Sequence, residues 1–327
     1  MNLLITSAGR RTQLLKYFIK EFQNQGEIIV TDSDPLAPAM HIGARGYVVP
    51  PITDAHYLDR LKEICMKEKI RGMFSLIDPE LSLLAQNIRQ FEELGVKLFV
   101  SPYVVTETCF DKYAMYQFLT ANGFKTPRTY RTREEFKKAL DEGQISFPAF
   151  VKPRTGSASI GIHEVYDMEE LELVLKRDPT LLIQELMRGE ELGVDVYTDI
   201  LSKEIISIFA KKKLKMRAGE TDKAVSFRDE KLFCMVEKLV RKLGSLGPID
   251  IDVFLVNGEY YISEVNPRFG GGYPLAYECG ENFPIYILNN LKGIANHPRI
   301  GEYREGLVML KHDVVTIVEG KWKELRR

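Results

Sequence analysis

Short apolar runs alternate with amphipathic stretches along the first hundred residues of the chain. Runs of strand length occur at residues 3–7, 27–32, 46–50, 72–77 and 97–101. Between most of them lie stretches such as 57–67 and 80–94, in which apolar residues recur at helical spacing. Strands separated by crossover helices are typical of a parallel sheet. We therefore predict a doubly wound α/β domain at residues 1–110.

The pattern changes after a helical stretch at residues 106–122, where the sequence TPRTY breaks the periodicity. Beyond it most apolar runs follow one another as strands, with helices predicted at 168–177 and 230–243. Strands grouped with few helices indicate an α+β arrangement built on antiparallel pairing. We predict two such subdomains, at residues 111–190 and 191–327.

The last pair of strands, PIDIDVFLV and EYYISEVNP, carries the most informative polar pattern. They are joined by Asn-Gly, which accepts the positive φ that tight hairpin turns require. If these two residues sit in a three-residue loop with a G1 bulge, Asp252 lies opposite Glu264 and Asn266 falls on the same face. Three oxygen ligands would then converge, and Asp250 shares the strand parity of Asp252, so the identity of the first ligand stays open.

Carboxylates on one sheet face repel one another unless a cation or a proton relieves them. Oxygen-only ligands suit Mg²⁺, with Mn²⁺ as the alternative ion. The competing interpretation is a solvated acidic face. Arg268 and the glycines at 270–272 favour a metal–nucleotide site, because arginine can bind phosphate bidentately and glycine lets the backbone approach a ligand closely.

Upstream segments support a nucleotide site only in combination. FVKPRTGSASIGI places Lys152 at a strand end, before a loop of small residues whose N–H groups could cover phosphates. This loop is not a Walker A motif. The strand that runs into residues 184–187 would offer backbone groups to an adenine edge, and a carboxylate a few residues later could bind ribose.

The segment AKKKLKMRAGETDKA places three lysines and Arg217 at alternate positions, hence on one face of a strand. Lysines commonly protect an edge strand from pairing with other chains. We therefore expect Arg217 to contact a ligand and most of the lysines to face solvent.

Composition excludes several functional classes. The 327 residues suffice for two or three compact lobes, and 45 basic against 46 acidic side chains leave no charge excess that calls for nucleic acid or an acidic membrane. No apolar run suits a signal peptide or a membrane span, so we expect a cytoplasmic protein. The four cysteines and five histidines are scattered, which argues against a disulfide framework, a zinc site or a Cys/His nucleophile.

In this order, a lysine before a helix and the motifs VKPRTGSASIG, IQELMRGEE, RAGET and EVNPR resemble the ATP-grasp superfamily of carboxylate–amine ligases, over about residues 106–293. The N-terminal stretch is similar to the domain that precedes the ATP site in one module of a carbamoyl phosphate synthase large subunit. The resemblance implies an N-terminal parallel-sheet domain followed by an ATP-grasp fold of two α+β subdomains with antiparallel sheets.

The resemblance also implies roles for residues at matching positions. Those implied for ATP are Lys112, Lys152, Thr155, Gly156, Ser157, Ser159 and Gly161 at the phosphates, the backbone of Glu185, Leu186 and Met187 at adenine, and Glu191 at the ribose. Asp252, Glu264 and Asn266 would bind magnesium, while Arg268 and Arg217 would act as catalytic cations. Gly271 and Glu220 would lie at the substrate, with Asp78 and Glu80 reaching across from the first domain.

The reaction implied is transfer of the γ-phosphoryl group of ATP to a carboxylate, followed by attack of an amine on the acyl phosphate, with release of ADP and phosphate. Positioning and electrostatics carry such a reaction, so no side-chain nucleophile is required. We expect small-molecule carboxylate and amine substrates, and a homodimer is compatible with this class.

Three alternatives stay open. The first is carbamoyl-phosphate-synthase-like phosphorylation of a small carboxylate, and the second is a non-catalytic ATP-binding protein. The most distant is an NAD-dependent oxidoreductase, because Asp32 lies about 23 residues after Gly9, near the spacing of a ribose-binding acid. Only Gly9 remains of the G-x-G-x-x-G pattern, however.

Overall fold

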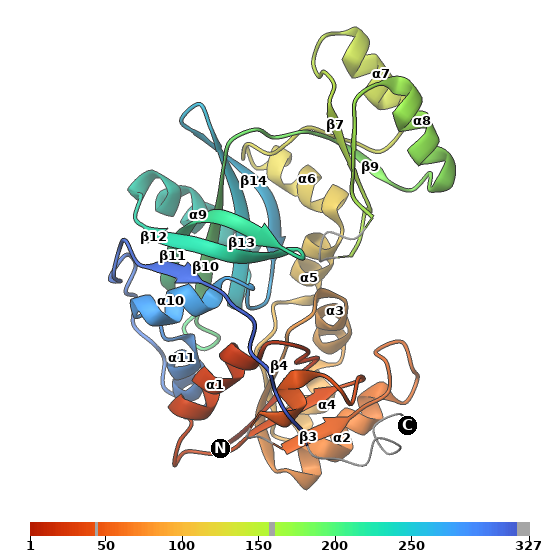
Figure 1. Ribbon diagram of the computed structural model, residues 1–327. Helices are drawn as coiled ribbons and strands as arrows, with labels where there is room; N and C mark the ends of the chain where they lie inside the picture. Colours follow the sequence, from red (N-terminus) through yellow and green to blue (C-terminus); the bar gives the residue numbers. More distant parts are fainter. Residues whose placement is uncertain (43–44, 157–160, 319–327) are drawn as a thin grey trace.

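The computed structural model describes residues 1–42, 45–156 and 161–318, organised around three β-sheets (Figure 1). The N-terminal sheet is parallel, in the order β3-β2-β1-β4-β5. Its strands are β1 (Asn2–Thr6), β2 (Ile28–Asp32), β3 (Arg45–Val48), β4 (Ile70–Ser75) and β5 (Lys97–Leu98). The connecting helices are α1 (Thr12–Glu21), the 3-10 turn η1 (Pro38–His41), α2 (Tyr57–Lys67), α3 (Asp78–Gln86) and α4 (Ile88–Glu93). The predicted doubly wound parallel sheet is confirmed.

Two helices predicted as continuous are each divided in two. The stretch 80–94 forms α3 and α4, which meet at Asn87. The stretch 106–122 forms α5 (Tyr103–Phe110) and α6 (Lys112–Ala121). Asp111 causes the second break, because its backbone is extended and its side chain accepts hydrogen bonds from the N–H groups of Tyr113 and Ala114, the second and third residues of α6. This break places Lys112 at the first residue of a helix.

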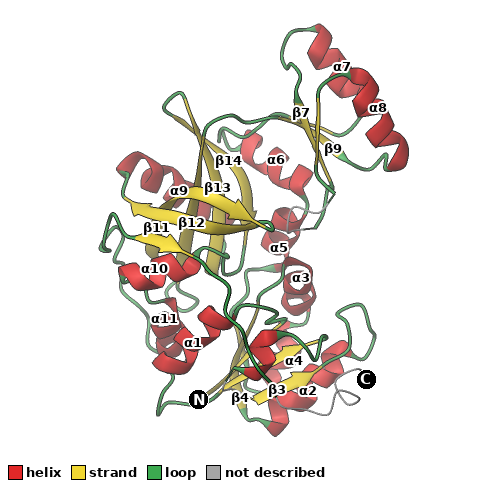
Figure 2. Cartoon of the chain, in the orientation of Figure 1, coloured by secondary structure: helices red, strands yellow, loops and turns green. Residues whose placement is uncertain are grey.

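The second sheet is small and antiparallel, in the order β6-β9-β7-β8. Its strands are β6 (Thr129–Tyr130), β7 (Ala149–Lys152), β8 (His163–Val165) and β9 (Leu182–Glu185). Helices α7 (Arg133–Asp141) and α8 (Met168–Arg177) lie side by side against it (Figure 2). Phe136 of α7 and Leu171 of α8 share one apolar core with the strands. The β7–β8 connection includes the glycine-containing loop.

The third sheet is antiparallel, in the order β14-β13-β10-β11-β12-β15. Its strands are β10 (Glu190–Thr198), β11 (Ile205–Arg217), β12 (Glu220–Phe227), β13 (Gly247–Val256), β14 (Glu259–Asn266) and β15 (Val308–Leu310). The helices of this region are α9 (Glu230–Leu243), α10 (Tyr273–Cys279) and α11 (Phe283–Leu291). The α8 and α9 bounds agree with the prediction, because an aspartate caps the start of each helix.

The hairpin of β13 and β14 has the predicted pairing but a different turn. Val256 pairs with Glu259, so Asn-Gly forms a two-residue loop, with positive φ at both positions, and the expected three-residue loop is wrong. The extra residue is Ser263, a bulge in β14. Because this bulge shifts the register by one residue, Asp252 still lies opposite Glu264, as predicted.

Aromatic packing joins the first domain to the third sheet. Phe269 follows β14, and its ring lies 5.7 Å from that of Phe18 in α1 and 5.3 Å from that of Phe74 in β4. This contact holds the segment between β14 and α10 against α1 and β4. Division of the chain at residues 110 and 190 stays our proposal. The first and second sheets each lie within one of the resulting segments, whereas β10 of the third sheet begins at Glu190, the last residue of the second segment. None of the helices in the described ranges has the length and apolar character to span a membrane.

Candidate active site

A cavity of about 630 Å³ lies between the second and third sheets. It brings together most of the predicted site residues, namely Lys112, Lys152, Thr155, Gly156, Glu185, Leu186, Met187, Glu191, Glu220, Asp252, Glu264, Asn266, Arg268 and Gly271. Its described lining does not include Asp78, Glu80, Gly161 or Arg217. Ser157 and Ser159 lie outside the described residues.

One face of the third sheet supplies the acidic wall of this cavity. The pairing of β13 with β14 places Asp250 opposite Asn266 and Asp252 opposite Glu264. On the other side of β13, Asp250 pairs with Asp195 of β10. Burial raises the pKa of Asp252, and the neighbouring charges of Asp250 and Glu264 raise it further, against the opposing effect of Lys213. The carboxylates of this face therefore repel one another, and Lys213 relieves that repulsion only in part.

Two buried lysines of β11 meet this acidic face. Lys211 donates a hydrogen bond to Asp195 and lies 3.8 Å from Asp250, and Lys213 donates to Asp252. The expectation that most of these lysines face solvent is wrong for both, whereas Lys215 is exposed. The reason is sheet order: β11 lies between β10 and β12, so it is not an edge strand that needs protection.

Two further lysines approach the same carboxylates from the second sheet and α6. The Nζ of Lys112 lies 3.4 Å from Glu264 and donates to the carbonyl of Gly156. Burial lowers the pKa of Lys152 to about 8, although Glu264 opposes this effect. Lys152 thus lies deep in the cavity with its charge incompletely compensated.

Arg268 links this face to the first domain. Its guanidinium donates to the Oδ2 atom of Asp78 from Nε at 3.2 Å and from Nη2 at 3.1 Å, and lies 3.7 Å from Asp250. Asp78 is the first residue of α3, and its Oδ1 atom is buried without a hydrogen-bond partner among the described residues. Asp78 therefore contacts Arg268 from the first domain, and its predicted place at the substrate stays a proposal.

Glu80 does not reach across. It is fully buried in the first domain, where it accepts hydrogen bonds from the hydroxyl groups of Ser7, Tyr57 and Ser75. The prediction failed because the first turn of α3 directs two acidic residues to different sides. Glu80 holds the loop after β1 to the sheet.

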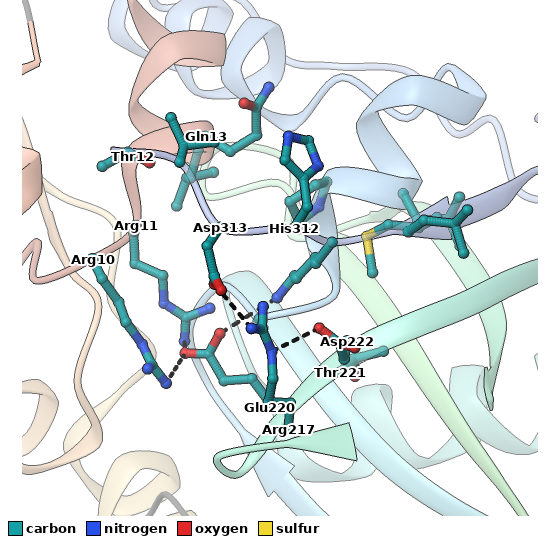
Figure 3. Close-up of a pocket in the computed structure, with 18 of the residues that line it drawn as sticks. Arg10, Arg11, Thr12, Gln13, Arg217, Glu220, Thr221, Asp222, His312 and Asp313 are labelled. Carbon is teal, nitrogen blue, oxygen red and sulfur yellow. Dashed lines mark hydrogen bonds and ion pairs between the residues drawn. The ribbon is translucent and has the colours of Figure 1, made fainter. Parts of the chain in front are cut away.

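Arg217 also lies apart from the carboxylate pair. Its guanidinium is bonded to Asp222 at 3.0 Å and to Asp313 at 2.9 Å, and it lines a second cavity (Figure 3). Glu220, by contrast, lines both cavities. The structure thus places one of the two predicted catalytic cations, Arg268, beside the acidic face and the other outside it.

The three consecutive glycines are explained by the charged side chains that press against them. A Cβ atom at Gly270 would lie 2.4 Å from the carboxylate of Asp250, and one at Gly272 would lie 2.4 Å from the Cε of Lys211. A Cβ at Gly271 would lie 3.0 Å from the guanidinium of Arg11. None of the three has a positive φ. The prediction was that these glycines let the backbone approach a ligand. In the structure they leave room for charged side chains of the site, namely those of Asp250, Arg11 and Lys211.

The far end of the cavity is less polar. Residues 185–187 leave the end of β9 near Phe150, Ile162 and Phe254. The N–H of Glu185 donates to the carbonyl of Arg128 at 2.8 Å, so residues 186 and 187 are the first beyond the sheet pairing. Apolar walls beside free-standing backbone suit a planar heterocycle.

Comparison with known families draws these observations together. The family model described as "ATP-grasp domain" matches residues 109–272, half of the chain. The chain belongs to the ATP-grasp family. A second model, "PylC-like, N-terminal domain", matches residues 3–99. The identification of an ATP-grasp enzyme from sequence motifs is confirmed.

Individual ATP-grasp relatives are distant. The formate-dependent phosphoribosylglycinamide formyltransferase of Sulfolobus acidocaldarius is 24% identical over 288 residues, 78% of this chain and 68% of that protein. The carbamoyl phosphate synthase large chain of Pseudomonas putida is 23% identical over 237 residues, 68% of this chain but 22% of its own length. N5-carboxyaminoimidazole synthetase from Staphylococcus aureus, solved with ADP, has a TM-score of 0.72 at 17% identity, covering 93% of this chain and 79% of that one. The structural likeness shows the fold.

Several charged residues in or beside this cavity were not predicted as part of the site. Arg11 and Lys213 line the cavity, Lys211 contacts its acidic face, and Arg10 and Lys311 line the second cavity. Arg10 and Arg11 follow β1 and were visible only as a basic pair in the N-terminal motif. Lys211 and Lys213 were seen but assigned to solvent, because the order of strands in a sheet is not readable from local alternation. Lys311 belongs to β15 and its continuation, which no pattern predicted.

Proposed function

We propose that this ATP-grasp protein joins a small-molecule carboxylate to an amine at the expense of ATP. The observation that carries the proposal is the gathering of Lys112, Lys152, Lys213 and Arg268 around the Asp252–Glu264 pair in one cavity. Phosphoryl transfer depends on neutralising the negative charge of the phosphate groups and on positioning them. Cations grouped around a pair of carboxylates in one cavity suit both requirements.

The cavity orients the nucleotide in one direction. The less polar end at residues 185–187 would hold adenine, and Glu191 would accept hydrogen bonds from the ribose hydroxyls. Lys112 and Lys152 would contact the phosphates, with Thr155 and Gly156 at the mouth of the loop above them. The γ-phosphoryl group would then lie nearest Arg268.

Asp252, Glu264 and Asn266 fit a hard cation, because all their donor atoms are oxygen and two of them are charged. In the described ranges no group of three His, Cys, Asp or Glu side chains is arranged to hold a metal ion unaided. We infer that these three residues would hold Mg²⁺ or Mn²⁺ when the nucleotide is bound. The ion would supply neutralisation of the phosphate charge.

The chemistry proceeds in two displacements. A carboxylate oxygen of the substrate attacks the γ-phosphorus, the bond to the β-phosphate oxygen breaks, and ADP leaves. The amine then attacks the acyl carbon of the acyl phosphate, phosphate departs, and the nitrogen loses a proton. Arg268, fixed by Asp78, would steady the transferred group, which requires no side-chain nucleophile.

The alternatives separate on specific observations. An oxidoreductase is disfavoured because the ATP-grasp family model matches half of the chain and only Gly9 remains of the G-x-G-x-x-G pattern. Phosphorylation of a small carboxylate, as in carbamoyl phosphate synthesis, shares the first displacement and differs in the nucleophile. A non-catalytic ATP-binding protein would keep the cavity without turnover. Homodimerisation and a cytoplasmic location stay proposals from the sequence.

The decisive test is release of ADP from Mg-ATP, with and without pools of small carboxylates and amines. Pool-dependent release should fall about a hundredfold to a thousandfold in Glu264→Gln. Glu259→Gln, on the same strand but 46% exposed, is the matched control and should leave release unchanged. Nucleotide binding without release in any pool would favour the non-catalytic alternative.

A further inference from the structure

A second cavity of about 610 Å³ adjoins the first (Figure 3). Its walls come from the start of α1, from β12, from the segment between β14 and α10, and from residues 307–314 and 316 around and beyond β15. The two cavities share Arg11, Glu220, Thr221 and Gly271 as lining. A molecule placed here would therefore reach the phosphate end of the nucleotide cavity.

The shared wall carries an excess of positive charge. Glu220 faces three cations: Arg10 and Arg11, each at 3.5 Å, and Lys311 at 3.4 Å. These separations exceed those of close charge-assisted hydrogen bonds, which are about 2.7–2.9 Å. The single carboxylate of Glu220 is thus shared by three cations, and it forms a close ion pair with none of them.

Neighbouring charges do not remove this excess. Arg217 is bonded to both Asp222 and Asp313, so those three groups carry one net negative charge and offset part of the excess. Over the whole lining of the second cavity, five basic side chains still face four acidic ones. Glu278, which also lines the cavity, accepts a hydrogen bond from the hydroxyl of Tyr17 at 2.8 Å. Among the described side chains, the acid that contacts Arg11 and Lys311 is Glu220 alone.

Helix α1 adds to the positive potential. It begins at Thr12, directly after the arginine pair, with no side-chain cap and no acidic residue in its first turn. The N-terminus of a helix favours anions. The loop also follows β1, which lies next to β4 at the point where the strand order reverses, a place where open α/β sheets bind ligands.

Burial makes the uncompensated cations costly. The side chain of Arg11 is only 20% exposed, and burial lowers its pKa. Burial likewise lowers the pKa of Lys311. A bound anion would stabilise the charged form of both side chains, because its negative charge replaces the hydration that burial removes.

We propose that Arg11 and Lys311 bind a second anionic group of the substrate, so that the substrate is a small carboxylate that also carries a carboxylate or phosphoryl group. This inference rests on the proposed function for the identity of the first carboxylate. Glu220 acts as the counter-ion that occupies the subsite without substrate. Gly271, against which Arg11 and Glu220 both pack, leaves room for the exchange.

The test measures binding, not turnover. Calorimetric titrations of the full chain with a bound non-hydrolysable ATP analogue and Mg²⁺ would compare butyrate with two probes of similar length, succinate and 3-phosphonopropionate. Wild type should bind at least one dianion about tenfold more tightly than butyrate. Succinate and 3-phosphonopropionate then distinguish a carboxylate from a phosphoryl partner.

Variants assign the preference to residues. Arg11→Gln and Lys311→Gln should each reduce the dianion preference about tenfold, because each removes a charged hydrogen bond. Arg11→Lys should restore part of it. Glu220→Gln should bind the dianion more tightly, since a competing carboxylate is lost. Lys20→Gln, on helix α1, which begins directly after Arg11 in the chain, is 70% exposed; it is the matched control and should retain the full preference.

The proposal is overturned if neither dianion binds, if butyrate binds as well as both dianions, or if the preference survives in the Arg11→Gln, Lys311→Gln double variant. Failure of the proposed function looks different: the dianion preference would be present and dependent on Arg11, but no pool would release ADP. ADP release with monocarboxylates alone would leave the ligase intact and remove this subsite.

Discussion

Two buried carboxylates at the end of β10 illustrate how the molecule separates structure from function. Asp199 accepts hydrogen bonds from the amide side chains of Asn290 and Asn296 and from three backbone N–H groups. Asp195, four residues earlier, is bonded to Lys211 and lies beside Asp250. Although burial alone would raise it, the amide hydrogen bonds hold the pKa of Asp199 below its usual value. Burial raises the pKa of Asp195, Lys211 opposes this, and repulsion by Asp250 adds to it.

The difference lies in what each carboxylate leaves unsatisfied. Neutral donors surround Asp199 completely, so no ligand could improve its environment, and its role is to fix the turn after β10 against α11. Asp195 belongs to a group of charges that balance only in part, next to a cavity. Such a group changes its balance when a charged ligand arrives, which is why perturbed charges cluster at functional sites.

The largest effect that sharpens this comparison is expected from Lys211→Met. It leaves Asp195 and Asp250 without their buried cation, so the free energy of unfolding should fall by about 3–5 kcal/mol in urea titrations. Lys212→Met is the control: its side chain is 41% exposed and pairs with Glu190, so the change should stay below about 1 kcal/mol. Equal losses in the two variants would contradict the assignment.

Asp199→Asn tests the structural side of the comparison. The amide places a donor among five donors, so unfolding free energy should fall by about 2–3 kcal/mol. Binding of an ATP analogue, measured on the folded variant, should stay unchanged, because Asp199 does not line the cavity. Asp178→Asn changes a carboxylate that is bonded only locally, to Thr180 in an exposed turn, so it should cost less than about 1 kcal/mol and leave analogue binding unchanged. If Asp199→Asn weakened nucleotide binding and kept its stability, Asp199 would have a role in the site and the contrast with Asp195 would be wrong.

The next effect concerns pH and Lys152. Because burial lowers its pKa to about 8, this lysine is cationic below that pH and neutral above it. Phosphate favours the cation, so affinity for an ATP analogue should be full below pH 8 and fall by up to about tenfold per pH unit above it. Lys152→Gln should bind more weakly at pH 7 and lose this dependence. Lys125→Gln, 51% exposed, should keep it; a flat wild-type profile would oppose the interpretation.

The sequence predicted what depends on local pattern. The parallel sheet, helices α8 and α9, and the pairing of Asp252 with Glu264 follow from periodicity, capping and turn chemistry. The pairing of Asp252 with Glu264 was predicted correctly, but the extra residue was placed wrongly, because the bulge lies at Ser263 and not in the loop. Either position of one extra residue gives the same parity at Asp252.

What depends on strand order could not be predicted. Lys211 faces the site because β11 is an interior strand, and local alternation gives the same pattern for an edge. Arg11 and Lys311 contact Glu220 although Arg11 and Glu220 are 209 positions apart in the chain. Glu80 and Asp78 lie in one helical turn, and only the packing of α3 decides which of them contacts Arg268.

The smallest expected effect comes from comparing two glycines. Gly271 is required because charged side chains lie close to it, whereas Gly258 is required because its backbone has a positive φ. In Gly271→Ala the new Cβ would lie 3.0 Å from the guanidinium of Arg11, 3.1 Å from the carboxylate of Glu220 and 3.2 Å from the Cβ of Glu220. Because two of these three atoms are at flexible side-chain ends, stability should change by less than about 1 kcal/mol while succinate affinity falls about threefold. Gly258→Ala has open space but a φ of +76°, so it should lose about 1 kcal/mol in unfolding and keep its succinate affinity. Urea titration and calorimetry on both variants measure the two quantities. If both glycines behaved alike, the close approach of Arg11 to Gly271 would have no part in anion binding, and the charge excess at Glu220 would have to act without it.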